Sequence, residues 1–536
     1  MCVTYLSAHK ASGGSTAVAE DETQDEARRL LADPATHGGG KVEVVETHAN
    51  VIFLGPELAF KMKKAVRYPY LDYGTPERRR RFCEAEVEIN RRTAPEIYID
   101  AVPLTRERGG ALALDGAGEP VEWVVRMKRF DDGKLLDRLA RRGELTDRIC
   151  RDASDVIFDF HQQSETRAGR DAAADMAAVA DGNIAELRRH GEAVFEDRAI
   201  DLLEERTRQA IESGRSLLRQ RAAGGAVRHV HGDLHLRNIV LLDGRPTLFD
   251  AIEFDPGLSD IDVLYDLAFL LMDLLHRDLK REANLVMNRY LARGGDYRGV
   301  GLLPLYLSLR AGIRAHTTAS AAKGPGDREK AGEAQAYLDL ALAMLEPDHP
   351  RAVAIGGASG TGKSTAAAML APTLGEAAGA VHLRSDVIRK RLKGRRPEEK
   401  LGESAYSSAV SRRVFHTLAE EARTVIEAGR PVVVDAVFGH ARNIDPLSAA
   451  LAVEGVSLEG FWLDADPAIL RERVGGRRDD ASDADERVLA KQLGNLERPA
   501  GWRLIDASGS PEDTVALIRA ALNEDNSGAP QGRSRL

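Results

Sequence analysis

One segment, residues 351–371, restricts how this chain can fold more than any other. Residues 357–364 read GASGTGKS, the spacing G-x-x-x-x-G-K-[ST], between an apolar run, AVAI, and a helical pattern, TAAAMLAPTL. In this arrangement backbone N–H groups turn toward phosphate oxygens, and the following helix directs its positive end at them. Lys363 adds a charge for the transferring phosphate, and Ser364 is the expected Mg²⁺ ligand. The segment predicts a site for ATP and Mg²⁺ made of Gly357, Ala358, Ser359, Gly360, Thr361, Gly362, Lys363, Ser364 and Thr365.

The sequence around this segment predicts a parallel sheet. Short apolar strands, RAVAIGG, AVHLRSD, PVVVDAV and LEGFWLD, alternate with long helical patterns. Parallel strands need such crossover helices. We therefore expect a parallel-sheet α/β/α domain over residues 350–523, and the two prolines in residues 344–351 mark the predicted boundary before it.

Two acidic residues follow predicted strands of this domain. Ligands bind at the carboxyl ends of parallel strands, and Asp386 and Asp435 stand at two such ends. We predict that Asp386 accepts the proton of an acceptor hydroxyl and that Asp435 binds Mg²⁺ or orients its water. A role as helix N-cap is the alternative for each residue.

A group of arginines follows the last of these strands. Arg473 and Arg477 lie at i and i+4 of a helical pattern, where like charges repel, so a phosphate partner would explain them. The alternative is a solvated basic face that pairs with the aspartates nearby. With its phosphate-binding segment, this half resembles the small P-loop kinases of the gluconate kinase and zeta-toxin type. The resemblance implies a mobile arginine lid over the transferring phosphate and an acceptor-side role for Asp386.

A second constellation lies in the first half of the chain. Asp233 belongs to a His-Gly-Asp triplet, Asn238 follows it, and two apolar runs flank Asp243-Gly244 before the second run ends at Asp250. This pattern predicts a hairpin with a two-residue turn, which brings Asn238 within about one residue of being opposite Asp250. Oxygen atoms of both side chains can then bind Mg²⁺, and Asp233 can orient an attacking hydroxyl.

His-Gly-Asp with an asparagine five residues after the aspartate resembles the aminoglycoside phosphotransferase and choline kinase group. The resemblance implies that Asp233 is the catalytic base and that Asn238 and Asp250 bind metal. It also implies a two-lobed protein-kinase-like domain, and the pattern of strands, a helix and further strands, followed by helices, fits such a domain over residues 41–345. The alternatives for His231 and His235 are a transition-metal site, such as zinc, or core histidines, but no third nitrogen or sulfur ligand is spaced to complete a metal site.

A kinase-like lobe also needs a lysine on its small sheet and a glutamate on the neighbouring helix, which together hold the nucleotide phosphates. The run AFKMKK offers Lys61 and Lys63, which share a face because strands alternate with a period of two. The resemblance favours Lys61. Glu84, Glu86 and Glu88 lie on the predicted helix, and only Glu84 and Glu88 share a face. The choice among the three stays open, with Glu84 as the first candidate.

The order of one phosphotransferase-like half and one P-loop kinase half resembles bacterial proteins described as bifunctional aminoglycoside phosphotransferase/ATP-binding proteins. The expected fold is multidomain, α+β followed by α/β. The expected activity is that of a bifunctional ATP-dependent kinase, each half transferring the γ-phosphate to an alcohol group of a small molecule. Its expected catalytic residues are Asp233, Asp386, Lys363, Arg473 and Arg477. The alternatives are one half that regulates the other as a nucleotide-binding switch or pseudokinase, and a polynucleotide 5′-kinase in the second half.

Composition narrows the expected partners and location. The 536 residues include 84 acidic and 75 basic ones, with a net charge of −9, so no net positive field favours nucleic acid. Three cysteines without paired spacing, no recognisable signal sequence and no apolar run of spanning length predict a cytoplasmic protein without membrane partners. The sequence predicts no oligomeric state. We expect a flexible lead-in with a short helix at residues 1–40 and a disordered tail at residues 524–536.

Overall fold

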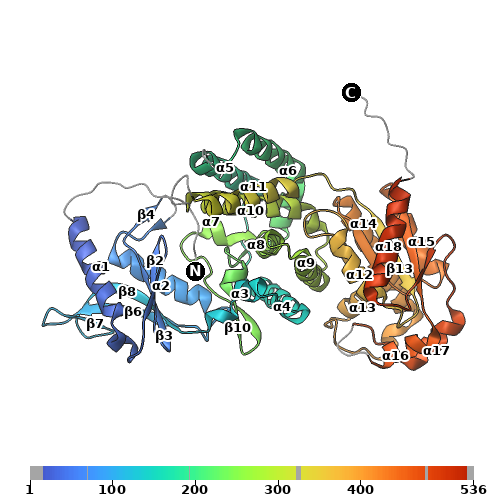
Figure 1. The fold of residues 1–536 in the computed structure, drawn as a ribbon, viewed down its shortest axis with the longest axis horizontal. Helices are drawn as coiled ribbons and strands as arrows, with labels where there is room; N and C mark the ends of the chain where they lie inside the picture. Colours follow the sequence, from blue (N-terminus) through green and yellow to red (C-terminus); the bar gives the residue numbers. More distant parts are fainter. Residues whose placement is uncertain (1–15, 69–70, 192–193, 322–326, 477–480, 528–536) are drawn as a thin grey trace. The chain divides into compact units, whose positions relative to one another are not determined.

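The computed structural model describes residues 16–68, 71–191, 194–321, 327–476 and 481–527. Its contacts group the chain into two compact units (Figure 1). The amino-terminal unit comprises residues 1–277 and 304–345, and the carboxy-terminal unit comprises residues 278–303 and 346–536. Within the described residues, no helix is long and apolar enough to cross a membrane.

The amino-terminal unit begins with an antiparallel sheet. In the described residues it has six strands in the order β1-β2-β3-β8-β6-β7, and the helix α2 packs against β6 and β8. β2 and β3 form a hairpin that turns at Gly55-Pro56, since Leu54 of β2 pairs with Ala59 of β3. α2 starts where Thr75 accepts a hydrogen bond from the Arg78 amide, as an N-cap does. The bounds are β1 (Glu43–Glu46), β2 (Asn50–Leu54), β3 (Leu58–Lys63), β4 (Arg67–Tyr68), β5 (Leu71–Asp72), α2 (Pro76–Asn90), β6 (Tyr98–Arg106), β7 (Leu112–Leu114) and β8 (Glu119–Lys128).

The lead-in differs from the prediction. A helix, α1 (Thr16–Ala32), is longer than the expected short one, and Ala27 and Leu31 are fully buried in the core of the sheet. The Gln24 amide donates to the Lys63 carbonyl and to the Glu122 carboxylate. Residues 23–32 are therefore packed rather than flexible, because their apolar face covers the sheet.

Helices dominate the rest of the amino-terminal unit. α8 is buried along most of its length, which explains its very apolar sequence. Two short antiparallel strand pairs lie between the helices in sequence, β9 with β12 and β10 with β11. The bounds are α3 (Leu136–Arg141), α4 (Asp147–Gln163), α5 (Ala172–Gly191), α6 (Asp197–Ala223), β9 (Val227–His229), β10 (Ile239–Leu242), β11 (Arg245–Leu248), α7 (Pro256–Ser259), β12 (Asp260–Asp262), α8 (Val263–His276), α10 (Leu303–Ser320) and α11 (Arg328–Met344).

The carboxy-terminal unit has a parallel sheet with the order β14-β15-β13-β16-β17 in its described residues. The four predicted strands are present. The fifth, β17, is missed by sequence reasoning because RLID is short and alternates exposed and buried residues. The helix α18 continues to Ser527, so the predicted tail begins too early, and residues 528–536 lie outside the described residues. The bounds are β13 (Ala352–Gly357), α12 (Lys363–Leu370), β14 (Val381–Arg384), α13 (Ser385–Leu392), α14 (Ser408–Glu427), β15 (Val432–Asp435), α15 (Ala441–Val453), β16 (Leu458–Asp464), α16 (Pro467–Gly475), α17 (Glu486–Asn495), β17 (Arg503–Asp506) and α18 (Pro511–Ser527).

One helix of the carboxy-terminal unit lies, in sequence, between two segments of the amino-terminal unit. α9 (Lys280–Gly294) was expected in the first domain, but its contacts lie with the carboxy-terminal sheet. Asn284 donates to the carbonyls of Ala378 and Ala380, and Asn288 Oδ1 accepts from the His382 amide of β14. β14 is an edge strand, so these amide side chains take the place of a neighbouring strand. The expected first domain, 41–345, therefore lacks residues 278–303.

Candidate active sites

The predicted catalytic loop of the amino-terminal unit, residues 231–238, is held by acids of α8. Asp266 accepts hydrogen bonds from the amides of His231 and Gly232, at 3.1 and 2.9 Å. Asp273 accepts one from the Leu236 amide at 3.1 Å. Gly232 has φ +80°, and a Cβ there would lie 2.7 Å from the Leu258 carbonyl oxygen. Only glycine fits this position, so the His-Gly-Asp triplet has a structural reason for its middle residue.

Asp233 is 5% exposed and lies at the centre of this loop. The Asn238 amide donates to its carboxylate at 3.0 Å, and His235 Nε2 lies 3.4 Å from the same oxygen. Burial alone would raise the pKa of Asp233, but the charge and hydrogen bond of His235 lower it below its ordinary value. The carboxylate is therefore ionised at neutral pH and able to accept a proton.

The predicted hairpin is confirmed. Asp243 and Gly244 form its turn with φ +49° and +76°, and Ile239 pairs with Leu248. The Phe249 amide donates to the Asn238 carbonyl at 3.0 Å, so Asn238 lies one residue from being opposite Asp250. Asp250 itself has φ +62°, a conformation in which aspartate is tolerated.

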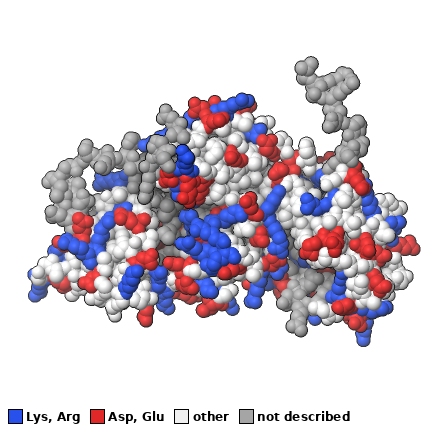
Figure 2. All heavy atoms as spheres, in the orientation of Figure 1, with Lys and Arg blue, Asp and Glu red and all other residues white. Residues whose placement is uncertain are grey.

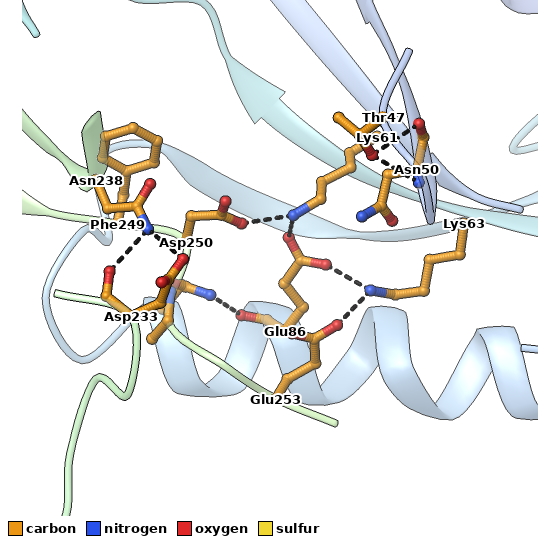
Figure 3. A network of polar contacts seen from close by, with 12 residues as sticks. Thr47, Asn50, Lys61, Lys63, Glu86, Asp233, Asn238, Phe249, Asp250 and Glu253 are labelled. Atoms are coloured by element: carbon orange, nitrogen blue, oxygen red, sulfur yellow. Dashed lines mark hydrogen bonds and ion pairs between the residues drawn. The ribbon is translucent and has the colours of Figure 1, made fainter. Parts of the chain in front are cut away.

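Lys61 joins the sheet to this hairpin. Its Nζ lies 2.7 Å from Glu86 Oε1 and 2.6 Å from Asp250 Oδ1 (Figure 3). Burial alone would lower the pKa of Lys61, but the carboxylates of Asp250 and Glu86 raise it well above its ordinary value. The choice of Glu84 is wrong, because Glu84 pairs with Arg80 on the exposed face of α2. Glu86 lies on the buried face of that helix. The apolar residues on this face could have indicated from the sequence that Glu86 points inward.

Lys63 forms a second buried connection that sequence reasoning left out of the site. Its Nζ lies 2.7 Å from Glu86 Oε2 and 2.5 Å from Glu253 Oε1, so the two lysines share one glutamate (Figure 3). The Tyr73 hydroxyl donates to the same Glu253 oxygen at 2.8 Å. Lys63 and Glu86 are both fully buried. The alternation that put Lys61 and Lys63 on one face thus brings both into the same network.

The donors of this site fit a hard cation. An amide oxygen of Asn238 and the carboxylate of Asp250 are the kind of oxygen ligands that Mg²⁺ takes together with nucleotide phosphates. Within the described residues, no cluster of three or more His, Cys, Asp or Glu side chains could hold a metal alone. His231 is fully buried and its Nε2 contacts the Phe249 carbonyl, the arrangement expected of a core histidine.

The phosphate-binding segment of the carboxy-terminal unit joins β13 to α12. Gly357 has φ +138°, and a Cβ there would lie 2.4 Å from the Leu463 carbonyl oxygen, so the turn requires glycine. Lys363 is the first residue of α12, and its Nζ donates to the Ala358 carbonyl at 2.7 Å. The loop therefore surrounds the N-terminus of α12, and a helix N-terminus attracts phosphate.

Asp435 ends β15 beside this loop. Ser364 Oγ donates to Asp435 Oδ1 at 3.0 Å, and His382 Nε2 lies 2.6 Å from Oδ2. Burial alone would raise the pKa of Asp435, but the hydrogen bond and charge of His382 lower it. Ser364 and Asp435, both predicted Mg²⁺ ligands, are thus brought together. His382 was missed by sequence reasoning, since a lone histidine in a strand carries no signal of its own.

A cavity of about 930 Å³ opens beside the loop. It is lined by Lys363, Asp386 and Arg473, among others. Burial raises the pKa of Asp386, although Arg384 nearby opposes the shift. Arg473 binds the carbonyls of residues 507–509 in the loop after β17. Arg477, the other predicted lid arginine, lies outside the described residues.

Arg389 lines the same cavity one helical turn after Asp386 and is 7% exposed. Its Nη1 donates to the Ala405 carbonyl at 2.9 Å, and the guanidinium lies over the Tyr406 ring. Its Nε has no hydrogen-bond partner in the part of the chain that the structure describes. Asp483 also lines this cavity and accepts hydrogen bonds from Lys390 of α13 and from Tyr406.

Comparisons with known proteins match two separate segments of the chain. Residues 76–303 match the model of a family described as "Phosphotransferase enzyme family", and residues 353–499 match that of the "AAA domain". A protein of Mycobacterium tuberculosis (strain ATCC 25618 / H37Rv), described as uncharacterized, is 29% identical over 484 residues, which are 88% of this chain and 94% of that protein.

Two solved structures are similar to parts of the chain. A choline/ethanolamine kinase family protein from Mesorhizobium loti is 16% identical over 60% of this chain and 98% of its own, with a TM-score of 0.36. A sugar kinase from Janibacter sp. HTCC2649 is 20% identical over 32% of this chain and 95% of its own, with a TM-score of 0.26. The chain therefore joins a segment that is similar to a phosphotransferase family to a segment that is similar to the AAA domain, and the first similarity indicates phosphotransfer as an activity.

Proposed function

We propose that the chain is a bifunctional ATP-dependent phosphotransferase, in which each unit transfers the γ-phosphate of ATP to a hydroxyl group of a small molecule. One observation carries the proposal for the amino-terminal unit. Ionised Asp233 lies within hydrogen-bond distance of Asn238, and Asp250 within ion-pair distance of Lys61. These are the parts that position an acceptor hydroxyl, a nucleotide and its cation in kinases.

Each residue of the amino-terminal unit has a separate task in this proposal. Asp233 orients the acceptor hydroxyl and takes its proton. The Asn238 amide holds the Asp233 carboxylate in place. Lys61, oriented by Glu86, binds the nucleotide phosphates. When bound, Mg²⁺ would be held by Asn238 and Asp250 and would neutralise charge on the phosphates.

The carboxy-terminal unit supports the same reaction with other residues. Lys363 would stabilise the transferring phosphate, and Ser364 with Asp435 would hold Mg²⁺. Asp386 would accept the hydroxyl proton, and its raised pKa makes it a stronger base than an exposed aspartate. Arg389 supplies an unused Nε–H donor beside it, which favours an acceptor that carries an oxygen-rich group.

Mass spectrometry of a metabolite extract tests the proposal. The whole chain, the Asp233→Asn variant and the Lys363→Ala variant are each incubated with ATP, Mg²⁺ and a cell extract. New phosphorylated masses are then compared. We expect each variant to lose a different set of products, because the two sites act separately. A product set unchanged by either substitution would contradict the proposal.

A second candidate is that one unit regulates the other. It is favoured by α9. In sequence this helix lies between two segments of the amino-terminal unit, but it contributes hydrogen bonds to the carboxy-terminal unit. Only residues 277–279 join α8 to α9, so the sequence passes from one unit to the other through a short segment. In the extract experiment, loss of every product in both variants would support this candidate over two independent kinases.

A further inference from the structure

Residues 278–303 lie within the first domain that the sequence predicts, but they belong to the carboxy-terminal unit. A carboxy-terminal domain that began at the predicted boundary, residue 350, would lack them. Their helix α9 packs on the edge strand β14 and on α13. These two elements carry His382 and Asp386, so the segment lies directly behind the candidate site of this unit.

Asn288 of α9 binds the backbone of β14. Its Oδ1 accepts a hydrogen bond from the His382 amide at 2.7 Å, and its Nδ2 donates to the Ala380 carbonyl at 3.2 Å. Asn284, one turn earlier, is 3% exposed and donates to the same carbonyl at 2.9 Å. An edge strand presents both unpaired N–H and unpaired C=O groups. An amide side chain can satisfy both kinds, because it carries an acceptor and two donors.

His382 connects this backbone contact to the phosphate-binding loop. Its amide binds Asn288, while its side-chain Nε2 lies 2.6 Å from Asp435 Oδ2. Asp435 Oδ1 in turn accepts a hydrogen bond from Ser364 Oγ at 3.0 Å. A hydroxyl and a carboxylate are oxygen ligands that suit Mg²⁺. A single residue, His382, therefore separates Asn288 from the predicted Mg²⁺ ligands.

The same segment also contacts the acceptor side of the cavity. Arg391 of α13 donates from Nη1 to the Tyr297 hydroxyl at 3.2 Å, and its Nη2 pairs with Glu421 of α14. Tyr297 is 3% exposed. Because α13 also carries Asp386, residues 278–303 support both the strand behind the metal ligands and the helix of the predicted base.

We propose that Asn288 is a positioning residue of the carboxy-terminal site, which holds β14 at His382 and so keeps the Asp435 carboxylate in place for Mg²⁺. The inference rests on the proposed function of this unit. Without the amide, the N–H of His382 would turn to water and β14 would lose its support on that edge. The imidazole contact with Asp435 would then loosen, and residues behind a metal ligand set how tightly the metal is held.

The test measures how Mg²⁺ supports nucleotide binding by the full chain. Binding of a fluorescent N-methylanthraniloyl derivative of ATP is titrated with Mg²⁺. The carboxy-terminal share is the difference between each chain and the same chain with Lys363→Ala. Asn288→Leu and Asn288→Ala should each raise the Mg²⁺ concentration at half-saturation about 3- to 10-fold, the worth of one hydrogen bond. Nucleotide affinity at saturating Mg²⁺ should stay unchanged.

A double-mutant cycle shows whether Asn288 acts through His382. His382→Ala removes the side chain that contacts Asp435 but keeps the backbone amide that Asn288 binds. In that background Asn288→Leu should change the Mg²⁺ requirement less than about twofold, because the connection is already broken. Effects that simply multiply in the double variant would overturn the proposal.

Asn288→Asp separates positioning from general stability. Its carboxylate still accepts from the His382 amide but cannot donate to the Ala380 carbonyl. Urea unfolding should therefore show a loss of stability, while the Mg²⁺ requirement stays closer to that of the parent than to that of Asn288→Leu. A Mg²⁺ requirement that merely follows the unfolding midpoint through all three variants would reduce Asn288 to a structural role and overturn the proposal.

Arg281→Gln is the control on the same helix. Lys and Arg side chains lie on the drawn surface near α9 (Figure 2), and Arg281 has 53% of its side chain exposed and pairs with Glu282. Its loss should change neither the Mg²⁺ requirement nor the unfolding midpoint. An effect on Mg²⁺ as large as that of Asn288→Leu would show that any change in α9 acts alike, against the proposal.

The readout also separates this inference from the function on which it rests. A raised Mg²⁺ requirement in the Asn288 variants that depends on His382, in a chain whose carboxy-terminal unit forms no phosphorylated product, would refute phosphotransfer by this unit but support the positioning role. Products that are lost in Lys363→Ala, together with an unchanged Mg²⁺ requirement in both Asn288→Leu and Asn288→Ala, would do the reverse.

Discussion

Lys63 Nζ lies 2.5 Å from Glu253 Oε1, and this contact joins the sheet of the amino-terminal unit to the loop that begins at Asp250. Lys63 also shares Glu86 with Lys61. The loop that carries a predicted Mg²⁺ ligand is therefore fixed to the sheet at two points, Asp250 and Glu253.

Lys63→Met should destabilise the amino-terminal unit by about 3–5 kcal/mol, since breaking a buried ion pair leaves uncompensated buried charge. Glu86 and Glu253 would both lose a partner. Urea unfolding followed by circular dichroism measures the change. Arg80→Met, which breaks the exposed pair with Glu84, is the matched control and should cost at most about 1 kcal/mol. Equal effects of the two substitutions would contradict the assigned role of Lys63.

Glu86→Gln should lower kcat/KM for ATP in the amino-terminal unit about 100-fold, the typical loss when one preorganised donor is misplaced. The glutamine no longer holds the charge of Lys61. Glu84→Gln, on the exposed face of the same helix, should leave the rate unchanged. Steady-state kinetics in the Lys363→Ala background measures both. A larger effect at Glu84 than at Glu86 would restore the assignment made from sequence.

The two activities should differ in their acid limbs. An aspartate must be ionised to accept a proton, so activity is lost as pH falls through its pKa. The pKa of Asp233 is lowered and that of Asp386 is raised. On acidification the carboxy-terminal activity should therefore disappear first. Profiles of kcat/KM against pH, taken with Asp233→Asn to isolate one site and Lys363→Ala to isolate the other, show the order. The reverse order would count against one of the two bases.

His382→Ala should raise the Mg²⁺ concentration needed for half-maximal carboxy-terminal activity about 10- to 100-fold, as loss of a residue behind a metal ligand commonly does. His382 holds Asp435 through a 2.6 Å contact. His440 lines the same cavity without a contact to Asp435 in the described residues, and His440→Ala is the control. An unchanged Mg²⁺ requirement in the His382 variant would show that Asp435 needs no support from it.

Local patterns were sufficient wherever neighbouring residues alone decide the structure. The turn at Asp243-Gly244 and the loop from Gly357 to Ser364 form as predicted, since their backbone conformations depend on glycines and on spacing along the chain. The catalytic loop belongs to the same class. Its triplet, its asparagine and its hairpin lie within twenty residues of one another.

Long-range packing decided the rest. Alternation placed Lys61 and Lys63 on one face of β3 but could not show that Glu86 would pair with both, because the partner is chosen by how α2 lies on the sheet. Residues 278–303 belong to the carboxy-terminal unit, where Asn284 and Asn288 hydrogen-bond to the backbone at the edge strand β14. No pattern within that helix predicts which strand it packs against. Sequence determines which groups are available, and the burial of a shared core determines which of them meet.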